Sequence, residues 1–198
     1  MGDISTFVNI EQQWNGAAQK TIFCGNNCRH TTTTSGITLN GKNQISFGAI
    51  TIDVGGSTDD IIALTASWYR CLTANVPIPY CTTGFSTYEW DMVFNTAENN
   101  IGNADGHSSV LDFLVTGLHE FGHVMGMPDY YSSSCCSTSI MCGRIGAGDI
   151  SKRTIDSGTR QCVAGLYATA SAPAQAPAPP QQWNIGSSSR LFSFLDMI

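Results

Sequence analysis

Charged side chains are scarce in this chain of 198 residues: lysine, arginine, aspartate and glutamate together make up only 12%. Serine, threonine, asparagine and glycine take their place, which is more typical of an extracellular surface than of a cytosolic one. The balance is acidic, with a formal net charge of −6. Because no run of lysine or arginine occurs, nucleic acid and anionic membrane surfaces are poor candidates for a partner.

Long apolar runs are also absent, since no stretch approaches the about 20 residues that a membrane span needs. The first residues, Met1-Gly2-Asp3, lead into a mixed polar segment rather than the apolar run of an export signal. Gly2 and Thr6 match the loose pattern for myristoylation, but a lipidated cytosolic protein fits badly with eight cysteines. We therefore expect a secreted mature form or fragment, with its natural N-terminus and export signal upstream.

Cysteine, by contrast, is abundant for this length. The count is even and no CxxC pair repeats, which favours disulfides in an oxidising compartment over a thiolate zinc site. We expect the local pairs Cys24–Cys28 and Cys71–Cys81, with the last four pairing among themselves in an order that the sequence leaves open. The eight are Cys24, Cys28, Cys71, Cys81, Cys135, Cys136, Cys142 and Cys162.

The length is enough for one ordinary domain and too short for two. We expect a domain over 1–169, a Pro/Ala-rich linker over 170–182, and a tail of unassigned role over 183–198. Apolar periodicity predicts an α+β fold. The predicted helices are 4–19, a segment from Ser109 or Asp112 to Gly126, and 155–167. The predicted strands are 44–54 with an irregularity near Gly48, the later half of 61–69, and 87–95. Residues 99–108 are predicted to form a loop.

Residues 119–129 read His-Glu-Phe-Gly-His-Val-Met-Gly-Met-Pro-Asp. Histidines four residues apart lie on one face of a helix, so His119 and His123 can bind one metal ion. Glu120 lies beside the first histidine and can take a proton from a water whose pKa zinc has lowered. This spacing predicts a zinc hydrolase site, although the short pattern alone can also occur by chance on a surface helix.

A turn and a third acidic residue strengthen this prediction. Gly126 permits a sharp turn after the helix and Pro128 enforces it. Asp129 then arrives where a third ligand would complete a tetrahedral site with one open position. Met141 follows in a Ser-Ile-Met-Cys-Gly turn. Together these features favour a zinc site over a chance match.

The motif His-Glu-x-x-His-x-x-Gly-x-x-Asp with a later Met resembles the metzincin clan of zinc peptidases, most of which end the motif in His. The Asp ending, with Tyr131, Cys135 and Met141, resembles the snapalysin type, which are small secreted bacterial neutral proteases. Upstream, Glu-Trp-Asp-Met-Val-Phe-Asn over 89–95 resembles the strand before the active-site helix in matrixin-like proteins. The resemblance covers residues 4–168 and is most specific over 119–141.

The resemblance implies a zincin-like fold: a twisted mixed sheet, an active-site helix beneath it, and a small disulfide-bound C-terminal subdomain. It implies zinc ligands at His119, His123 and Asp129, with Glu120 as general base. Met141 would form a hydrophobic floor under the zinc. The strand over 89–95 would be the edge with which an extended substrate pairs. Tyr131 would either stabilise the oxyanion or simply pack near the metal.

These inferences lead us to expect a secreted, monomeric zinc endopeptidase that hydrolyses internal bonds of an extended polypeptide. Two alternatives remain open: a catalytically silent zinc-containing binding or inhibitory module, and another zinc hydrolase such as an aminopeptidase. Asp105-Gly106-His107 could belong to a structural Ca²⁺ or second zinc site, but it offers too few oxygen ligands to argue for either. His30 is expected to be solvated. Asp156 is expected to open the last helix in a structural role.

Overall fold

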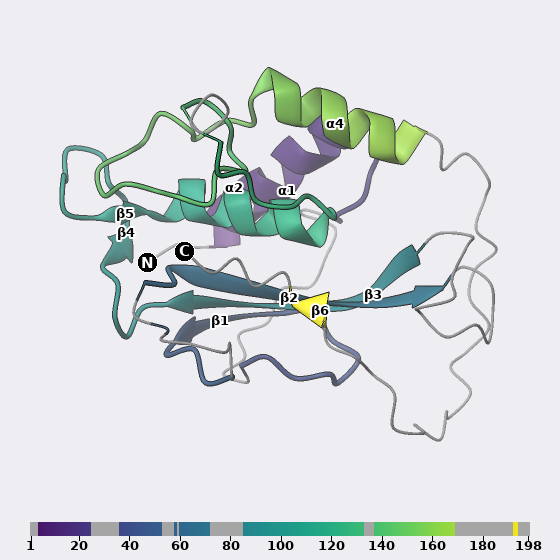
Figure 1. Ribbon diagram of the computed structural model, residues 1–198, viewed down its shortest axis with the longest axis horizontal. Helices are drawn as coiled ribbons and strands as arrows, with labels where there is room; N and C mark the ends of the chain where they lie inside the picture. The colour runs from purple at the N-terminus through teal and green to yellow at the C-terminus, as the bar shows by residue number, and fades with distance from the viewer. Residues whose placement is uncertain are drawn as a thin grey trace.

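A four-stranded mixed sheet forms the base of the fold in the computed structural model (Figure 1). The structure describes residues 4–24, 36–52, 58, 60–71, 85–132, 137–168 and 192–193. The strand order is β1-β3-β2-β6, in which β1 and β3 are parallel and the other two pairs are antiparallel. The strands are β1 (Gln44–Gly48), β2 (Ala63–Cys71), β3 (Phe85–Asn95) and β6 (Phe192–Ser193).

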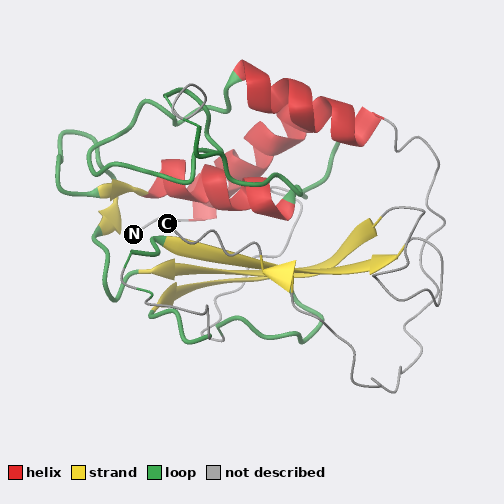
Figure 2. Cartoon of the chain, viewed as in Figure 1, coloured by secondary structure: helices red, strands yellow, loops and turns green. Residues whose placement is uncertain are grey.

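The described part of the chain has three helices, and all three lie on one side of the sheet (Figure 2). Helix α2 packs on β2, α1 packs on α2, and α4 packs on α1. The predicted α+β fold with a mixed sheet is therefore confirmed, and each helix lies where its apolar periodicity placed it. Their bounds are α1 (Ile4–Ala18), α2 (Phe113–Val124) and α4 (Ser157–Ala168).

The main hydrophobic core fills the space between the sheet and the helices. Trp14 of α1 is fully buried and donates its indole N–H to the Leu118 carbonyl of α2 at 3.0 Å, which ties the two helices together. Phe94 of β3 packs its ring against Phe113 of α2, with centroids 4.9 Å apart. Such aromatic pairs contribute beyond the area they bury. The core thus fixes α2, the helix that carries the histidines, against both α1 and the sheet.

The predicted edge position of the strand over 89–95 is wrong. Strand β3 lies between β1 and β2, with Asp91 opposite Gln44 on one side and Trp90 opposite Ser67 on the other. The edge position was implied by the resemblance, and the sequence of a strand does not determine which strands flank it. Among the described residues, the outer side of β2 is paired with β6 opposite Ala66 and Ser67.

Two other boundaries differ from the prediction. Strand β1 ends at Gly48, where φ is +147°, instead of continuing to residue 54. The segment 99–108, predicted to be a loop, contains the short strand β4 (Ile101–Gly102). β4 pairs in parallel with β5 (Leu111–Asp112), directly before α2. Two-residue strands carry too little periodicity to be recognised in a sequence.

The cysteine prediction needs one correction. Cys162 of α4 is an exposed free thiol, so it does not pair with the other three cysteines of the C-terminal half. A helix presents to solvent whichever residues lie opposite its apolar face, and Cys162 lies on that exposed face. Cys24 and Cys142 are each disulfide-bonded. The predicted pairs, Cys24–Cys28 and Cys71–Cys81, involve residues outside the described ranges or without a described side chain, and they stay predictions.

The linker over 170–182 also lies outside the described residues, as does most of the tail. Within the described ranges, no helix combines the length and the apolarity that crossing a membrane would require.

Candidate metal centre

The start of α2 is fixed by a buried carboxylate. Asp112 caps the helix by accepting a hydrogen bond from the Val115 N–H at 3.0 Å, and it also accepts one from the Ala104 N–H. Arg153 binds the same carboxylate, with 2.6 Å between Nη2 and Oδ2. Burial raises the pKa of Asp112, but the hydrogen bonds and the charge of Arg153 outweigh burial and hold it below its usual value. Of the two predicted start residues, the structure selects Asp112 over Ser109.

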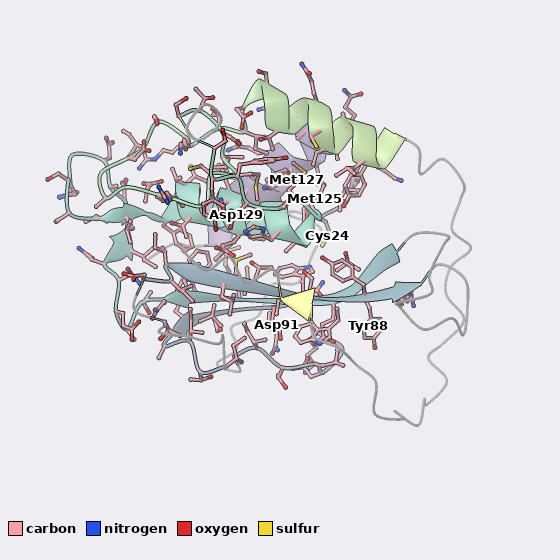
Figure 3. The ribbon with its side chains drawn as sticks, viewed as in Figure 1. Cys24, Tyr88, Asp91, Met125, Met127 and Asp129 are labelled. Atoms are coloured by element: carbon pink, nitrogen blue, oxygen red, sulfur yellow. The ribbon has the colours of Figure 1, made fainter. Side chains whose placement is uncertain are left out.

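The end of α2 reverses the chain toward the histidines, as the glycine and proline predicted. Gly126 adopts a left-handed φ of +85°, and its N–H donates to the His123 carbonyl at 2.9 Å. The Met127 N–H donates to the Gly122 carbonyl at 3.0 Å, which completes a Schellman motif. This turn brings Asp129 back beside α2, where Figure 3 shows it together with Met127.

Three side chains converge on one point after this turn. Nε2 of His119 lies 3.2 Å from Nε2 of His123 and 2.9 Å from Oδ1 of Asp129. The distance between Nε2 of His123 and the same carboxylate oxygen is 3.7 Å. The side chain of Asp129 is only 6% exposed. The structure therefore brings together all three residues that the sequence predicted as metal ligands.

Both imidazole rings are held from behind by main-chain carbonyls. Nδ1 of His119 lies 2.8 Å from the Ile140 carbonyl, and Nδ1 of His123 lies 2.9 Å from the Met127 carbonyl. A carbonyl can only accept, so each Nδ1 carries a proton, and a ring without a second proton directs its Nε2 lone pair at the shared point. Two lone pairs and a carboxylate oxygen this close repel one another unless a cation lies between them. Metal-binding histidines are commonly oriented in this way.

The pKa of His119 is raised, because a positive charge on this ring is favourable beside the carboxylate of Asp129. Burial lowers the pKa of this imidazole, but the hydrogen bond to Asp129 and the charges of Glu120 and Asp129 outweigh burial and raise the pKa to about 8. A proton on His119 would thus relieve the repulsion in the absence of a metal.

The donor set fits a transition metal. Two imidazole nitrogens and one carboxylate oxygen leave a fourth tetrahedral position open, which is the ligand pattern of catalytic zinc sites. The ligand atoms lie within 4.8 Å of one another, and the trio is the one group of three or more such ligands found among the described residues. Ca²⁺ prefers six to eight oxygen ligands and does not suit this set.

Thr65 is a residue that the sequence did not single out. Its hydroxyl donates to Oε2 of Glu120 at 2.6 Å, from strand β2 across to α2. The prediction missed it because the two residues are 55 positions apart, and no local pattern marks a threonine that faces a helix. Thr65 and Glu120 are both buried.

Met141, which the resemblance implies as a floor under the zinc, packs against α2, and its place relative to the metal stays a prediction. Met141 is fully buried, and a Cβ added to Gly122 would overlap its sulfur. The added atom would also lie 3.1 Å from the Trp14 ring. Gly122, an unspecified position of the HExxH pattern, is therefore needed for the close approach of α2 to the turn that holds Met141.

Asp156 has the structural role that was expected of it. Its Oδ1 accepts from the Thr159 N–H at 2.9 Å and so caps α4. Its Oδ2 accepts from the Ile140 N–H at 3.0 Å. Because the Ile140 carbonyl holds His119, Asp156 supports the orientation of this imidazole through the main chain of Ile140.

Tyr131 lies beside the third ligand and is 39% exposed. Its hydroxyl is 3.5 Å from Oδ2 of Asp129, a long contact for a hydrogen bond. Its ring lies over Gly143, where an added Cβ would overlap the ring atoms. The tyrosine thus packs on the turn and reaches the ligand carboxylate with its hydroxyl.

The segment proposed for a second metal has a different arrangement. Asp105 and His107 are exposed. Arg153 donates to the side-chain oxygen of the neighbouring Asn103 at 2.6 Å as well as to Asp112. A guanidinium group thus supplies the positive charge beside these oxygens.

Comparisons of the whole chain with protein-family models, with curated proteins and with solved structures found no match.

Proposed function

We propose that this chain is a single-zinc endopeptidase of the metzincin type. The observation that carries the proposal is the convergence of His119, His123 and Asp129 on one point, with the buried carboxylate of Glu120, the residue next to His119, held by Thr65. A site that only stabilised the fold would need a fourth protein ligand and would have no use for a carboxylate beside it.

Zinc, when bound, would make water more acidic and polarise the peptide carbonyl. The residues of this chain would supply the proton transfers. Glu120 would accept the proton of the attacking water and later donate it to the amine nitrogen of the leaving peptide. Tyr131 would stabilise the developing oxyanion, because the residue is exposed and its hydroxyl lies beside Asp129.

The substrate would be an extended polypeptide. Strand β2 runs along α2 and carries Thr65, the residue in contact with Glu120. β3 is paired along both sides, whereas the outer side of β2 is paired with β6 only opposite Ala66 and Ser67. We therefore transfer the expected pairing from β3 to the part of the outer edge of β2 beyond its pairing with β6, where main-chain hydrogen bonds would bind a peptide without regard to its sequence. Such binding suits an endopeptidase.

The remaining inferences from the resemblance belong to this proposal. They are a matrixin-like domain over 1–169 with a small disulfide-bound C-terminal part, secretion from the cell, and action as a monomer. The disulfides at Cys24 and Cys142 support an oxidising compartment. A Ca²⁺ site at Asp105–His107 is not included, because Arg153 supplies positive charge there.

Cleavage of an unstructured protein tests the proposal. The purified chain with one equivalent of zinc should cut it internally, including after both termini are blocked. Glu120→Ala should bind zinc and lose activity by about 100- to 10,000-fold, the usual contribution of a general base. If only unblocked peptides are cut, the protein is an aminopeptidase. If the wild type binds zinc and cuts nothing, it is a silent binding module, and if it binds no zinc the central claim is wrong.

A further inference from the structure

The contact between Thr65 and Glu120 is short and selective. The threonine Oγ1 lies 2.6 Å from Oε2 of Glu120 but 3.3 Å from its main-chain carbonyl, so the hydroxyl proton goes to the carboxylate. Each of the two residues is only 5% exposed. Hydrogen bonds to a charged carboxylate are shorter and stronger than neutral ones, and burial strengthens them further. The contact is therefore an energetically substantial one.

The two partners differ in stiffness. Threonine is branched at Cβ and has few χ1 rotamers, and Thr65 lies within β2 in register with Met92 of β3. The position of its hydroxyl is therefore set by the sheet. Glutamate has three rotatable side-chain bonds, and Glu120 would lose much rotamer freedom in any single orientation. Thr65 removes that freedom from Glu120 before a substrate binds.

We propose that Thr65 is a positioning residue for Glu120. It holds Oε2, so that Oε1 is the oxygen that receives the proton of the attacking water. This inference rests on the proposed function. It gives a role in catalysis to a residue of the sheet, which lies outside the motif on the helix. Misplacement of a catalytic group by about 1 Å can cost about 100-fold in rate.

Three variants test the role by kinetics with the zinc-loaded protein and a blocked peptide that is cut internally. Thr65→Val keeps the shape and removes the hydroxyl, and we expect kcat to fall by about 10- to 100-fold while KM stays within about twofold. Thr65→Ser restores the hydroxyl and should recover kcat to within about threefold. Thr116→Val is the matched control, because it removes a buried hydroxyl on α2 that donates to the Asp112 carbonyl at 2.9 Å instead.

A double-mutant cycle tests the contact independently of enzymatic activity, with Tm measured in the presence of a chelator. Thr65→Val should lower Tm clearly when Glu120 is present and much less in the Glu120→Ala background, because the bond is then already lost. Thr65→Ala serves the same comparison if the valine variant does not fold.

The two failures can be told apart. The positioning role is overturned if Thr65→Val keeps the kcat of Thr116→Val, if serine gives no rescue, or if the two Tm shifts simply add. If the wild type binds zinc but does not cut the peptide, the proposed function itself fails, and the role of Thr65 in catalysis fails with it. In that case a non-additive cycle would still identify the contact as a structural one.

Discussion

The Nε2 atoms of His119 and His123 lie 3.2 Å apart, and the Oδ1 atom of Asp129 lies within 4 Å of both. This relationship needs positive charge from a metal ion or from a proton.

The charge of the third ligand should tune the acidity of water at the metal. Two neutral imidazoles leave Zn²⁺ its full charge, and Asp129 reduces the net charge of the site by one. We therefore expect Asp129→His to retain zinc and to shift the acidic limb of the pH–rate profile downward, because water at a more positive centre is more acidic. Zinc content and kcat/KM against pH measure this. Loss of zinc from the variant would show that geometry matters more than charge.

Without metal, the protein should lose stability as the pH rises. The pKa of His119 is about 8 in the folded protein and about 6.5 when unfolded. Its protonation therefore stabilises the fold fully below pH 6.5, and this contribution is lost as the pH rises through 8. The loss should be about 2 kcal/mol. Urea unfolding in chelator at pH 6 and pH 9 measures it, and His119→Gln should remove the difference. Equal stability of the wild type at both pH values would contradict the assignment.

Asp156 should affect both stability and metal affinity. Asp156→Ala removes the cap of α4 and the acceptor for the Ile140 N–H, and we expect a loss of about 2 kcal/mol. Zinc affinity should fall by about tenfold, because the Ile140 carbonyl that holds His119 becomes less fixed. Competition with a zinc-binding dye measures this. Asp149→Ala is the control, since it removes only local bonds to Ser151 and should leave zinc affinity unchanged.

The contact between α2 and the methionine turn should not tolerate a methyl group. Gly122→Ala would overlap the buried Met141 sulfur, and we expect a loss of about 1–3 kcal/mol. Gly16→Ala is the matched control in α1, because its added Cβ meets nothing within 4 Å. That control should be neutral or more stable by up to about 1 kcal/mol. Chemical denaturation of the two variants measures the contrast, and similar effects would mean that the turn can move away from α2.

Local information in the sequence was sufficient for the helices and for the convergence of His119, His123 and Asp129. The spacing of His119 and His123 and the turn at Gly126 act within a single helix and its end, so the chain itself encodes their geometry. Asp112 could be proposed as a cap because capping involves residues three positions apart.

Contacts between distant segments could not be predicted in the same way. The position of β3 inside the sheet depends on pairing with residues far away in the sequence, and the contact of Thr65 with Glu120 depends on the register of β2. Cys162 shows the same limit, because whether a cysteine has a partner depends on the face of the helix that carries it.

Main-chain carbonyls, rather than side chains, orient both histidines. A point substitution at Met127 or Ile140 changes the side chain but leaves the carbonyl in place. A mutational scan should therefore find these positions sensitive to the size and polarity of the side chain through packing, and not through loss of the hydrogen bond to the histidine. Insertions, deletions or a residue that cannot adopt the Gly126 conformation would move the carbonyls themselves. The orientation of the imidazoles should thus tolerate most single substitutions but be sensitive to changes in loop length.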